Sequence, residues 1–148
     1  MIAVTYPDAS FEAFSYDRSG NRILTTTRAG QAIAYDYDLH NRLVKKTYPD
    51  STETAFAYDQ LGRMTGAANP TADYAFSYND INQLLEYNLI LEGEEYAVSY
   101  GWDLSGNKTA ITYPGGTEYN RHYDNLNRLE RVENSVEDVL AEYAYDDL

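Results

Sequence analysis

Cysteine is absent from the 148 residues of this chain, so neither a disulfide framework nor a thiolate metal site is available. Basic residues are scarce as well. Eleven Lys and Arg stand against 24 Asp and Glu, and the formal net charge is -13. A nucleic-acid backbone or an anionic membrane would repel such a surface. The composition therefore argues against nucleic acid as a partner and leaves a soluble protein or a cationic partner.

Long apolar runs are also missing. No stretch approaches the roughly 18 apolar residues of a membrane helix, so we expect no membrane span. The N-terminal residues 1–6 lack the basic region and apolar segment of an export signal. We expect any such signal to lie outside this chain.

Tyrosine, in contrast, is abundant. Sixteen Tyr and four Phe against a single Trp are typical of β-strands, because aromatic side chains suit a pleated, half-buried surface. The aromatic residues recur at a nearly fixed interval and anchor seven copies of one short motif, which indicates a repeat protein. The anchors are Tyr16, Tyr37, Tyr58, Tyr78, Trp102, Tyr123 and Tyr145, spaced by 21, 21, 20, 24, 21 and 22 residues.

Each anchor is followed by a predicted turn. An acid comes next, and its side chain would accept a hydrogen bond from the backbone amide two residues on. These acids are Asp17, Asp38, Asp59, Asp103, Asp124 and Asp146, with Asn79 as the exception. Three residues further stands only Gly or Asn, the residues that enter positive φ most readily: Gly20, Asn41, Gly62, Asn82, Gly106 and Asn127. The pattern predicts a type I turn followed by a G1 bulge. Calcium binding is the weaker interpretation, because the spacing is not that of an EF-hand.

A second turn precedes most anchors, as in Tyr48-Pro49-Asp50, so each unit holds two strands and two turns. A second aromatic row stands two residues before the anchors, at Phe14, Tyr35, Phe56, Phe76, Tyr100 and Tyr143, with an arginine at position 121. Both rows would lie on one face of a sheet, opposite a thinly covered or wet face. We expect an insertion or bulge in the 24-residue interval that ends at Trp102. A cation or amide follows each turn and is predicted to pair with the turn aspartate or an aromatic face: Arg22, Arg42, Arg63, Gln83, Lys108 and Arg128.

The sequence thus predicts an all-β fold of tandem antiparallel β-hairpins, about 21 residues each, in a continuous curved or spiral sheet. We expect residues 1–148 to form a single array of about six to seven units, incomplete at both ends. The open strand edges then predict pairing with flanking repeats or self-association.

Three segments, Tyr16–Arg22, Tyr48–Ser51 and Tyr58–Arg63, resemble the YD repeats of RHS proteins, and the resemblance covers nearly the whole chain. That family includes bacterial polymorphic toxins, the cocoon subunits of insecticidal toxin complexes and the teneurins. The resemblance implies hairpins wound into a spiral sheet, which in the bacterial members forms a hollow shell around a C-terminal toxin domain. It also implies a secreted or cell-surface protein of bacterial origin whose partners are flanking repeats and an effector domain. The autoproteolytic segment that closes such shells has no counterpart here.

Candidate reactive groups do not converge in the sequence. His40 and His122 are the only imidazoles and are interpreted as ordinary turn and strand residues. No nucleophile elbow or phosphate-binding loop is present. We therefore expect no enzyme activity, no cofactor and no metal, with a glycosidase-like pair of acids as a remote alternative.

Two functions follow from these observations. The first is a non-catalytic structural segment of an RHS-type shell that encapsulates or presents a toxin or effector domain. The alternative is a carbohydrate-binding or adhesion module in which exposed tyrosine files stack on a glycan. Full burial of Tyr16, Tyr37, Tyr58 and Tyr123 would argue against the alternative.

Overall fold

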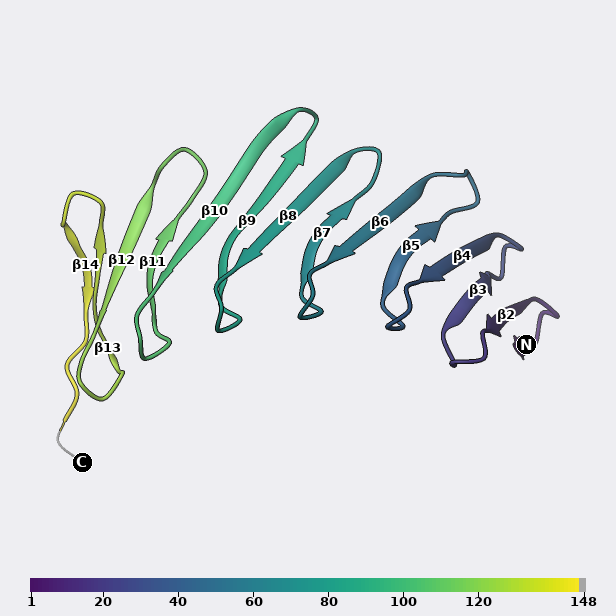
Figure 1. Ribbon diagram of the computed structural model, residues 1–148, viewed down its shortest axis with the longest axis horizontal. Coiled ribbons are helices and arrows are strands. Elements are labelled where there is room, and N and C mark those ends of the chain that lie inside the picture. The colour runs from purple at the N-terminus through teal and green to yellow at the C-terminus, as the bar shows by residue number, and fades with distance from the viewer. Residues whose placement is uncertain (147–148) are drawn as a thin grey trace. The chain divides into compact units, whose positions relative to one another are not determined.

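The computed structural model describes residues 1 to 146, which form β-strands and turns (Figure 1). Each strand neighbours the strands that precede and follow it in sequence. No helix occurs among these residues, and so none that is long and apolar enough to cross a membrane. The predicted all-β fold of tandem hairpins is confirmed. The strands are β1 (Ile2–Thr5), β2 (Phe11–Tyr16), β3 (Arg22–Thr26), β4 (Ala32–Tyr37), β5 (Leu43–Thr47), β6 (Glu53–Tyr58), β7 (Met64–Ala68), β8 (Ala72–Tyr78), β9 (Leu84–Leu91), β10 (Glu94–Trp102), β11 (Lys108–Thr112), β12 (Glu118–Tyr123), β13 (Leu129–Asn134) and β14 (Val139–Glu142).

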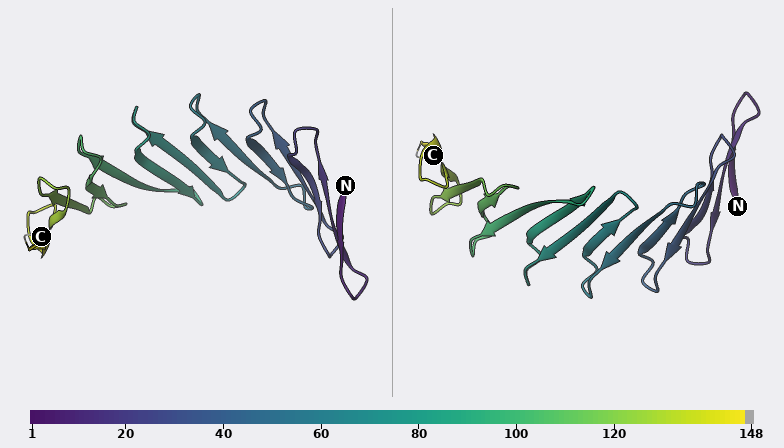
Figure 2. Two further views of the ribbon diagram at one scale, coloured as in Figure 1. Left: turned by 90° about the horizontal axis from the view of Figure 1, so that it is seen from below. Right: turned by 90° about the horizontal axis from the view of Figure 1, so that it is seen from above.

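The chain divides into two compact units, Met1–Asp73 and Tyr74–Leu148. Strands β1 to β7 belong to the first unit and β9 to β14 to the second, while β8 crosses the boundary. Figure 2 shows each unit, from two further sides, as one layer of strands. Most domains bury a sheet face against a second layer. Within the described residues of each unit, no such layer covers the strands. The predicted array also includes residues 147 and 148, which lie outside the described residues.

One face of the first unit carries the predicted aromatic row. The register places Phe14 opposite Thr25 and Tyr35 opposite Lys46, and the same face continues to Phe56. Residues two apart in a strand share a face, so the anchors that follow these aromatics lie on this side as well. The residues between the two rows, Ser15, Asp36 and Ala57, point to the opposite face; Asp36 and Ala57 are exposed and Ser15 is half-buried.

In the second unit the same face runs from Tyr100 through Ile111 and Tyr119 to Arg121. The arginine that interrupts the aromatic row in the sequence therefore stands within that row in the sheet. Val132 lies directly opposite it on the next strand. The cation thus occupies a position that an aromatic ring fills in most other units.

Little of the molecule is fully buried. The buried hydrophobic side chains of the described residues are Ala13, Tyr35, Val98 and Ile111, and the buried charged one is Glu133. Most of the row aromatics are half-buried. A single layer cannot enclose a core, so each hairpin depends on its neighbours and on the turns for its position.

The long interval before Trp102 is taken up by longer strands. Strands β9 and β10 have eight and nine residues, whereas β5 and β7 have five. They are joined at Glu92 and Gly93, whose φ values of 53° and 85° are those of a two-residue hairpin turn. The extra residues predicted as an insertion or bulge thus extend a regular hairpin.

A register shift stands immediately before the anchor of each repeat whose pairing is described. The shifts fall at Ser15/Tyr16, Asp36/Tyr37, Ala57/Tyr58, Gly101/Trp102 and His122/Tyr123. A bulge of this kind bends a strand and redirects its side chains. At Gly101 the chain passes so close to β11 that an added Cβ would lie 3.0 Å from the Cβ of Ala110. This bulge beside the anchor is separate from the predicted G1 bulge in the turn. It is therefore a regular part of the unit that the sequence pattern did not predict.

Candidate functional site

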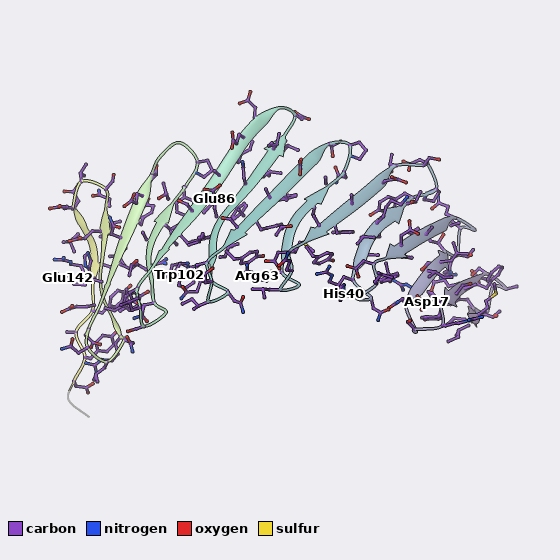
Figure 3. All side chains as sticks on the ribbon, in the orientation of Figure 1. Asp17, His40, Arg63, Glu86, Trp102 and Glu142 are labelled. Carbon is purple, nitrogen blue, oxygen red and sulfur yellow. The ribbon has the colours of Figure 1, made fainter. Side chains whose placement is uncertain are left out.

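The repeat turns gather most of the recurring polar residues at one edge of each unit. Figure 3 shows Asp17, His40 and Arg63 along this edge of the first unit. Positive φ is found at every predicted position, from 59° at Asn41 to 89° at Gly106. The full set is Gly20, Asn41, Gly62, Asn82, Gly106 and Asn127. In the turn of Asp59, the Gly62 amide donates to the Asp59 carbonyl at 3.1 Å, and the Asp59 amide donates to the Arg63 carbonyl at 2.9 Å. The predicted type I turn with a G1 bulge is confirmed.

The turn acid holds the loop from inside. Oδ1 of Asp59 accepts the amides of Leu61 and Arg63, each at 2.9 Å. Its Oδ2 accepts Nε of Arg63 at 2.6 Å. Equivalent bonds to Oδ1 occur at Asp17, Asp38, Asp103 and Asp124. One carboxylate thus satisfies two backbone donors and one side-chain donor, which explains why the turn selects an acid.

The partner of the acid stands four residues after it. Arginine serves at Arg42, Arg63 and Arg128, each forming an ion pair with its own turn aspartate. In two other turns Asn21 and Asn107 donate through Nδ2 instead, at 2.9 and 2.8 Å. We expected Arg22 and Lys108 in this role. The residues that pair with the turn acid are instead the ones immediately before them in the sequence.

Both misplaced cations lie over aromatic rings. The Arg22 guanidinium is 4.9 Å from the ring centroid of Tyr35, and Nζ of Lys108 is 4.1 Å from that of Tyr100. They fulfil the other predicted role of these cations, packing on an aromatic face.

At Asn79 the acid and the arginine are both replaced. Asn79 still accepts the Gln83 amide through Oδ1 at 2.9 Å, and its Nδ2 donates to Oε1 of Gln83 at 2.6 Å. The direction of the side-chain hydrogen bond is reversed, because Asn carries a donor and Gln supplies an acceptor. The exception in the sequence is therefore a matched substitution within one turn.

The turn bonds lower the pKa of the aspartates. The Arg42 backbone amide, helped by its side chain and by the His40 amide, lowers the pKa of Asp38 to about 2, against partial burial. The Asn21 side chain lowers the pKa of Asp17. The pKa values of Asp59, Asp103 and Asp124 are lowered by equivalent donors. Donors that favour the charged carboxylate thus explain every one of these shifts.

Acid is expected to loosen these turns. The pKa of Asp38 in the folded protein lies below the ordinary value. The contribution of this carboxylate to the free energy of unfolding is therefore complete above about pH 4 and is lost as the pH falls through about 2. Carbon-13 NMR of the side-chain carboxyl should show Asp38 titrating at about pH 2. In Asp38→Asn, which removes the titrating carboxyl, the loss of stability over this interval should be smaller. Titration of Asp38 at the ordinary carboxyl value would contradict this account.

Four anchor tyrosines are tied to the preceding repeat through their hydroxyls. The Tyr58 hydroxyl donates to the Leu43 carbonyl at 2.9 Å, and the Tyr123 hydroxyl donates to the Lys108 carbonyl at 3.0 Å. Tyr37 and Tyr145 donate in the same way to the carbonyls of Arg22 and Leu129. The aromatic spacing did not predict these bonds, because it shows where the rings lie and not where the hydroxyls point.

Trp102 fits the same role. Its indole Nε1 donates to the Leu84 carbonyl at 2.8 Å. Tryptophan has a donor and no acceptor, and the anchor tyrosines also act here as donors. The one anchor that departs from tyrosine therefore keeps the required chemistry.

Trp102→Phe should accordingly destabilise the second unit by about 0.5–1.5 kcal/mol, because the Leu84 carbonyl loses its donor. Trp102→Tyr should recover most of that loss, since a phenol donor serves in the other repeats. Urea unfolding followed by circular dichroism measures both variants. If Tyr proves no better than Phe at this position, the hydrogen bond does not matter and ring size does.

Consecutive turns are also joined along the edge. Nδ2 of Asn21 donates to Oδ1 of Asn41 at 2.7 Å, and Nδ2 of Asn107 donates to Oδ1 of Asn127 at 2.9 Å. Glycine and asparagine alternate at the positive-φ position from turn to turn. An asparagine there offers an acceptor to the preceding turn. The two residue types, equivalent in their local φ, thus differ in what they offer the neighbouring turn.

Arg42 also connects two consecutive turns. Its Nη1 donates to the Asp59 carbonyl at 3.0 Å, and its guanidinium lies 4.8 Å from the ring centroid of Tyr58. An added Cβ on Gly62 would lie 3.9 Å from the same Nη1. A long side chain from one turn therefore passes over a glycine in the next.

The turns at the opposite edge have a similar pattern of backbone hydrogen bonds. Tyr6, Tyr48 and Tyr113 accept through their carbonyls from the amide three residues later. Positive φ falls at Ala9, Ser51 and Gly116. The Tyr-Pro segments predict the turn, but not that Ala and Ser enter positive φ there.

The two histidines lie in different surroundings. His40 lies in an exposed turn, and Nε2 of His122 is 2.8 Å from Oε2 of the buried Glu133, which Arg131 also contacts at 2.9 Å. Over residues 1 to 146 no group of three or more His, Asp or Glu is placed to hold a metal ion. Asp146 is exposed.

Comparison with known proteins agrees with this geometry. The family model described as teneurin YD-shell matches residues 5–147. The crystal structures of TcdB2-TccC3-Cdc42 and TcdB2-TccC3 each cover 86% of this chain at 17% identity, with TM-scores of 0.69 and 0.68. The Photorhabdus luminescens Tc holotoxin pore matches with the same coverage and identity and a TM-score of 0.68. The match spans 7% of each of those chains. No curated protein matches the sequence.

Proposed function

Because the chain belongs to the teneurin YD-shell family, we propose that it is a non-catalytic segment of an RHS-type shell that encapsulates or presents an effector domain. Its partners would be flanking repeats and the effector domain of a longer parent chain. The solved structures with which it shares a fold are far longer than this chain, which supports a segment with further repeats around it. A shell of this kind would act outside the cell as a secreted or cell-surface protein.

The observation that carries this proposal is how the polar groups are used. The recurring aspartates, arginines and anchor donors bind backbone or side-chain groups of their own or a neighbouring repeat. Groups arranged to join one hairpin to the next support a structural role, as the wall of a shell requires.

Proteolysis of the parent chain tests the proposal. A domain enclosed by the shell should resist protease in the native chain and become accessible when Gly62→Val weakens the wall. Gly62→Asn, which suits the same backbone, is the matched control and should keep the protection. If no domain is protected in the native chain, encapsulation is wrong.

The alternative, glycan binding by the anchor row, is less well supported. Sugar rings stack on open aromatic faces, and the guanidinium groups of Arg42 and Arg128 lie 4.8 and 4.4 Å from the ring centroids of Tyr58 and Tyr145. Tyr37, Tyr58 and Tyr123 are half-buried, although Tyr16 is exposed. Anchor hydroxyls are also engaged by backbone carbonyls. A glycan screen that found binding abolished by Tyr16→Ala would favour the alternative.

A further inference from the structure

The repeat turns present a row of exposed aliphatic side chains. In the first unit, Leu39 and Leu61 are 99% and 69% exposed. In the second unit, Ile81, Leu104 and Leu126 are similarly exposed. All five occupy the loop between the turn acid, or Asn79 in its place, and the positive-φ residue.

The geometry of the turn does not require an aliphatic residue at this position. The acid, the positive-φ residue and the partner four residues on account for the turn geometry, and Ser19 occupies the loop of the first turn without an aliphatic neighbour. A single exposed leucine needs no explanation. An aliphatic residue in the other five described repeat turns forms a repeated apolar feature, which is typical of a surface that contacts another protein.

The opposite edge of the first unit offers a matching surface. A cavity of about 540 Å³ opens between its turns and is lined by Gln31, Tyr48, Pro49 and Pro70, among others. Neighbouring strands lie about 4.8 Å apart, so hairpins repeat about every 10 Å along both edges. A row of leucines at that spacing fits a partner whose recesses have the same spacing. A second row of the same hairpins has recesses at this spacing.

The charge distribution favours contact between two different edges over contact between two copies of the same edge. In the first unit the turns that carry the leucines hold Asp17, Asp38 and Asp59 with Arg18, Arg42 and Arg63, so the charges balance. The turns of the opposite edge hold Asp8 and Asp50 against Arg28 alone. Two opposite edges would repel each other, whereas a balanced, apolar edge meets an acidic edge without that cost.

We propose that the edge carrying Leu39 and Leu61 is a seam that packs into the edge carrying Pro49 and Pro70 on a second copy of this chain. The contact joins two different surfaces, so it adds rows of hairpins in one direction. The inference rests on the proposed shell function, since a wall made from a ribbon one hairpin wide requires rows joined at their edges. In a longer chain, another row of the same repeats would take the place of the second copy.

The absence of cysteine makes a direct test possible. Leu61→Cys and Gln31→Cys variants, mixed and oxidised at rising concentration, should form the mixed disulfide in preference to either homodimer. Both positions are exposed, so the folded chain should be retained, and circular dichroism checks this. Homodimers of Leu61→Cys in equal yield, or no cross-link at all, would overturn the seam.

Sedimentation provides the second measurement. Leu39→Ser and Leu61→Ser should each weaken self-association roughly tenfold, because each removes one aliphatic side chain from the contact. Val4→Ser on strand β1 is the matched control, since it removes an exposed apolar residue from the open strand edge instead. A monomer at all concentrations, or an equal effect of Val4→Ser, would overturn the proposal.

The outcomes separate the seam from the shell. A mixed cross-link in a parent chain that protects no domain keeps the seam and rejects encapsulation. A protected domain without the cross-link keeps the shell and rejects this edge as its seam.

Discussion

Gly62→Val is expected to destabilise the first unit by about 1–3 kcal/mol, whereas Gly62→Asn should be nearly neutral. The φ of Gly62 is 84°, a region that a β-branched residue enters only with strain. Space is not the obstacle, because the nearest atom to an added Cβ is Nη1 of Arg42 at 3.9 Å. Asparagine already adopts the same conformation at Asn41, where φ is 59°.

Urea unfolding followed by circular dichroism measures this difference as a shift of the transition midpoint at constant slope. Gly62→Ala should fall between the two variants, because it adds a Cβ without branching. The expected order of stability is therefore Asn, Ala, Val. If the valine and asparagine variants prove equally stable, backbone strain does not determine the residue at this position.

The sequence pattern predicted the local structure of each repeat well. A loop whose third position accepts only glycine or asparagine indicates positive φ, and an acid at its start indicates a carboxylate that accepts turn amides. Both features depend on residues within five positions of one another. Short-range geometry of this kind leaves a direct record in the choice of residue, as Gly62 and Asp59 demonstrate.

Connections between repeats were predicted poorly, for a physical reason. The bond from the Tyr58 hydroxyl to the Leu43 carbonyl depends on an acceptor that every residue carries, so no residue type marks it. The partner of the turn acid Asp17 is Asn21 and not Arg22. The prediction was displaced by one residue, because the bulge obscures the register in the sequence. Trp102 could have been interpreted from its chemistry, since its indole N–H can replace a phenol donor.

The exposed leucines were overlooked for a different reason. In a sequence, an aliphatic residue in a turn looks like an imperfect match to a polar pattern. Only the exposed fraction of Leu39 and Leu61 in a sheet without a second layer shows that these side chains lack an internal partner. Their position at the turn edge then becomes evidence about assembly.

Arg42→Ala tests whether the turns act together or singly. The guanidinium donates to Asp38 at 2.7 Å and to the Asp59 carbonyl at 3.0 Å, and it lies 4.8 Å from the ring centroid of Tyr58. An ion pair at the protein surface contributes about 0–1 kcal/mol. A hydrogen bond and a cation–π contact contribute about 0.5–1.5 and 0.5–1 kcal/mol. The substitution should therefore cost about 1–3 kcal/mol.

Arg18→Ala is the matched control. Arg18 is an exposed arginine in the turn before Gly20, so its loss should change stability by less than about 0.5 kcal/mol. Arg42→Lys separates the contributions, since a lysine keeps the charge but cannot donate to two acceptors in the fixed geometry of a guanidinium. We expect most of the stability to be lost in Arg42→Lys as well, measured by urea unfolding. Full stability in the lysine variant would mean that charge alone matters at this turn, and that the bond to Asp59 does not join one repeat to the next.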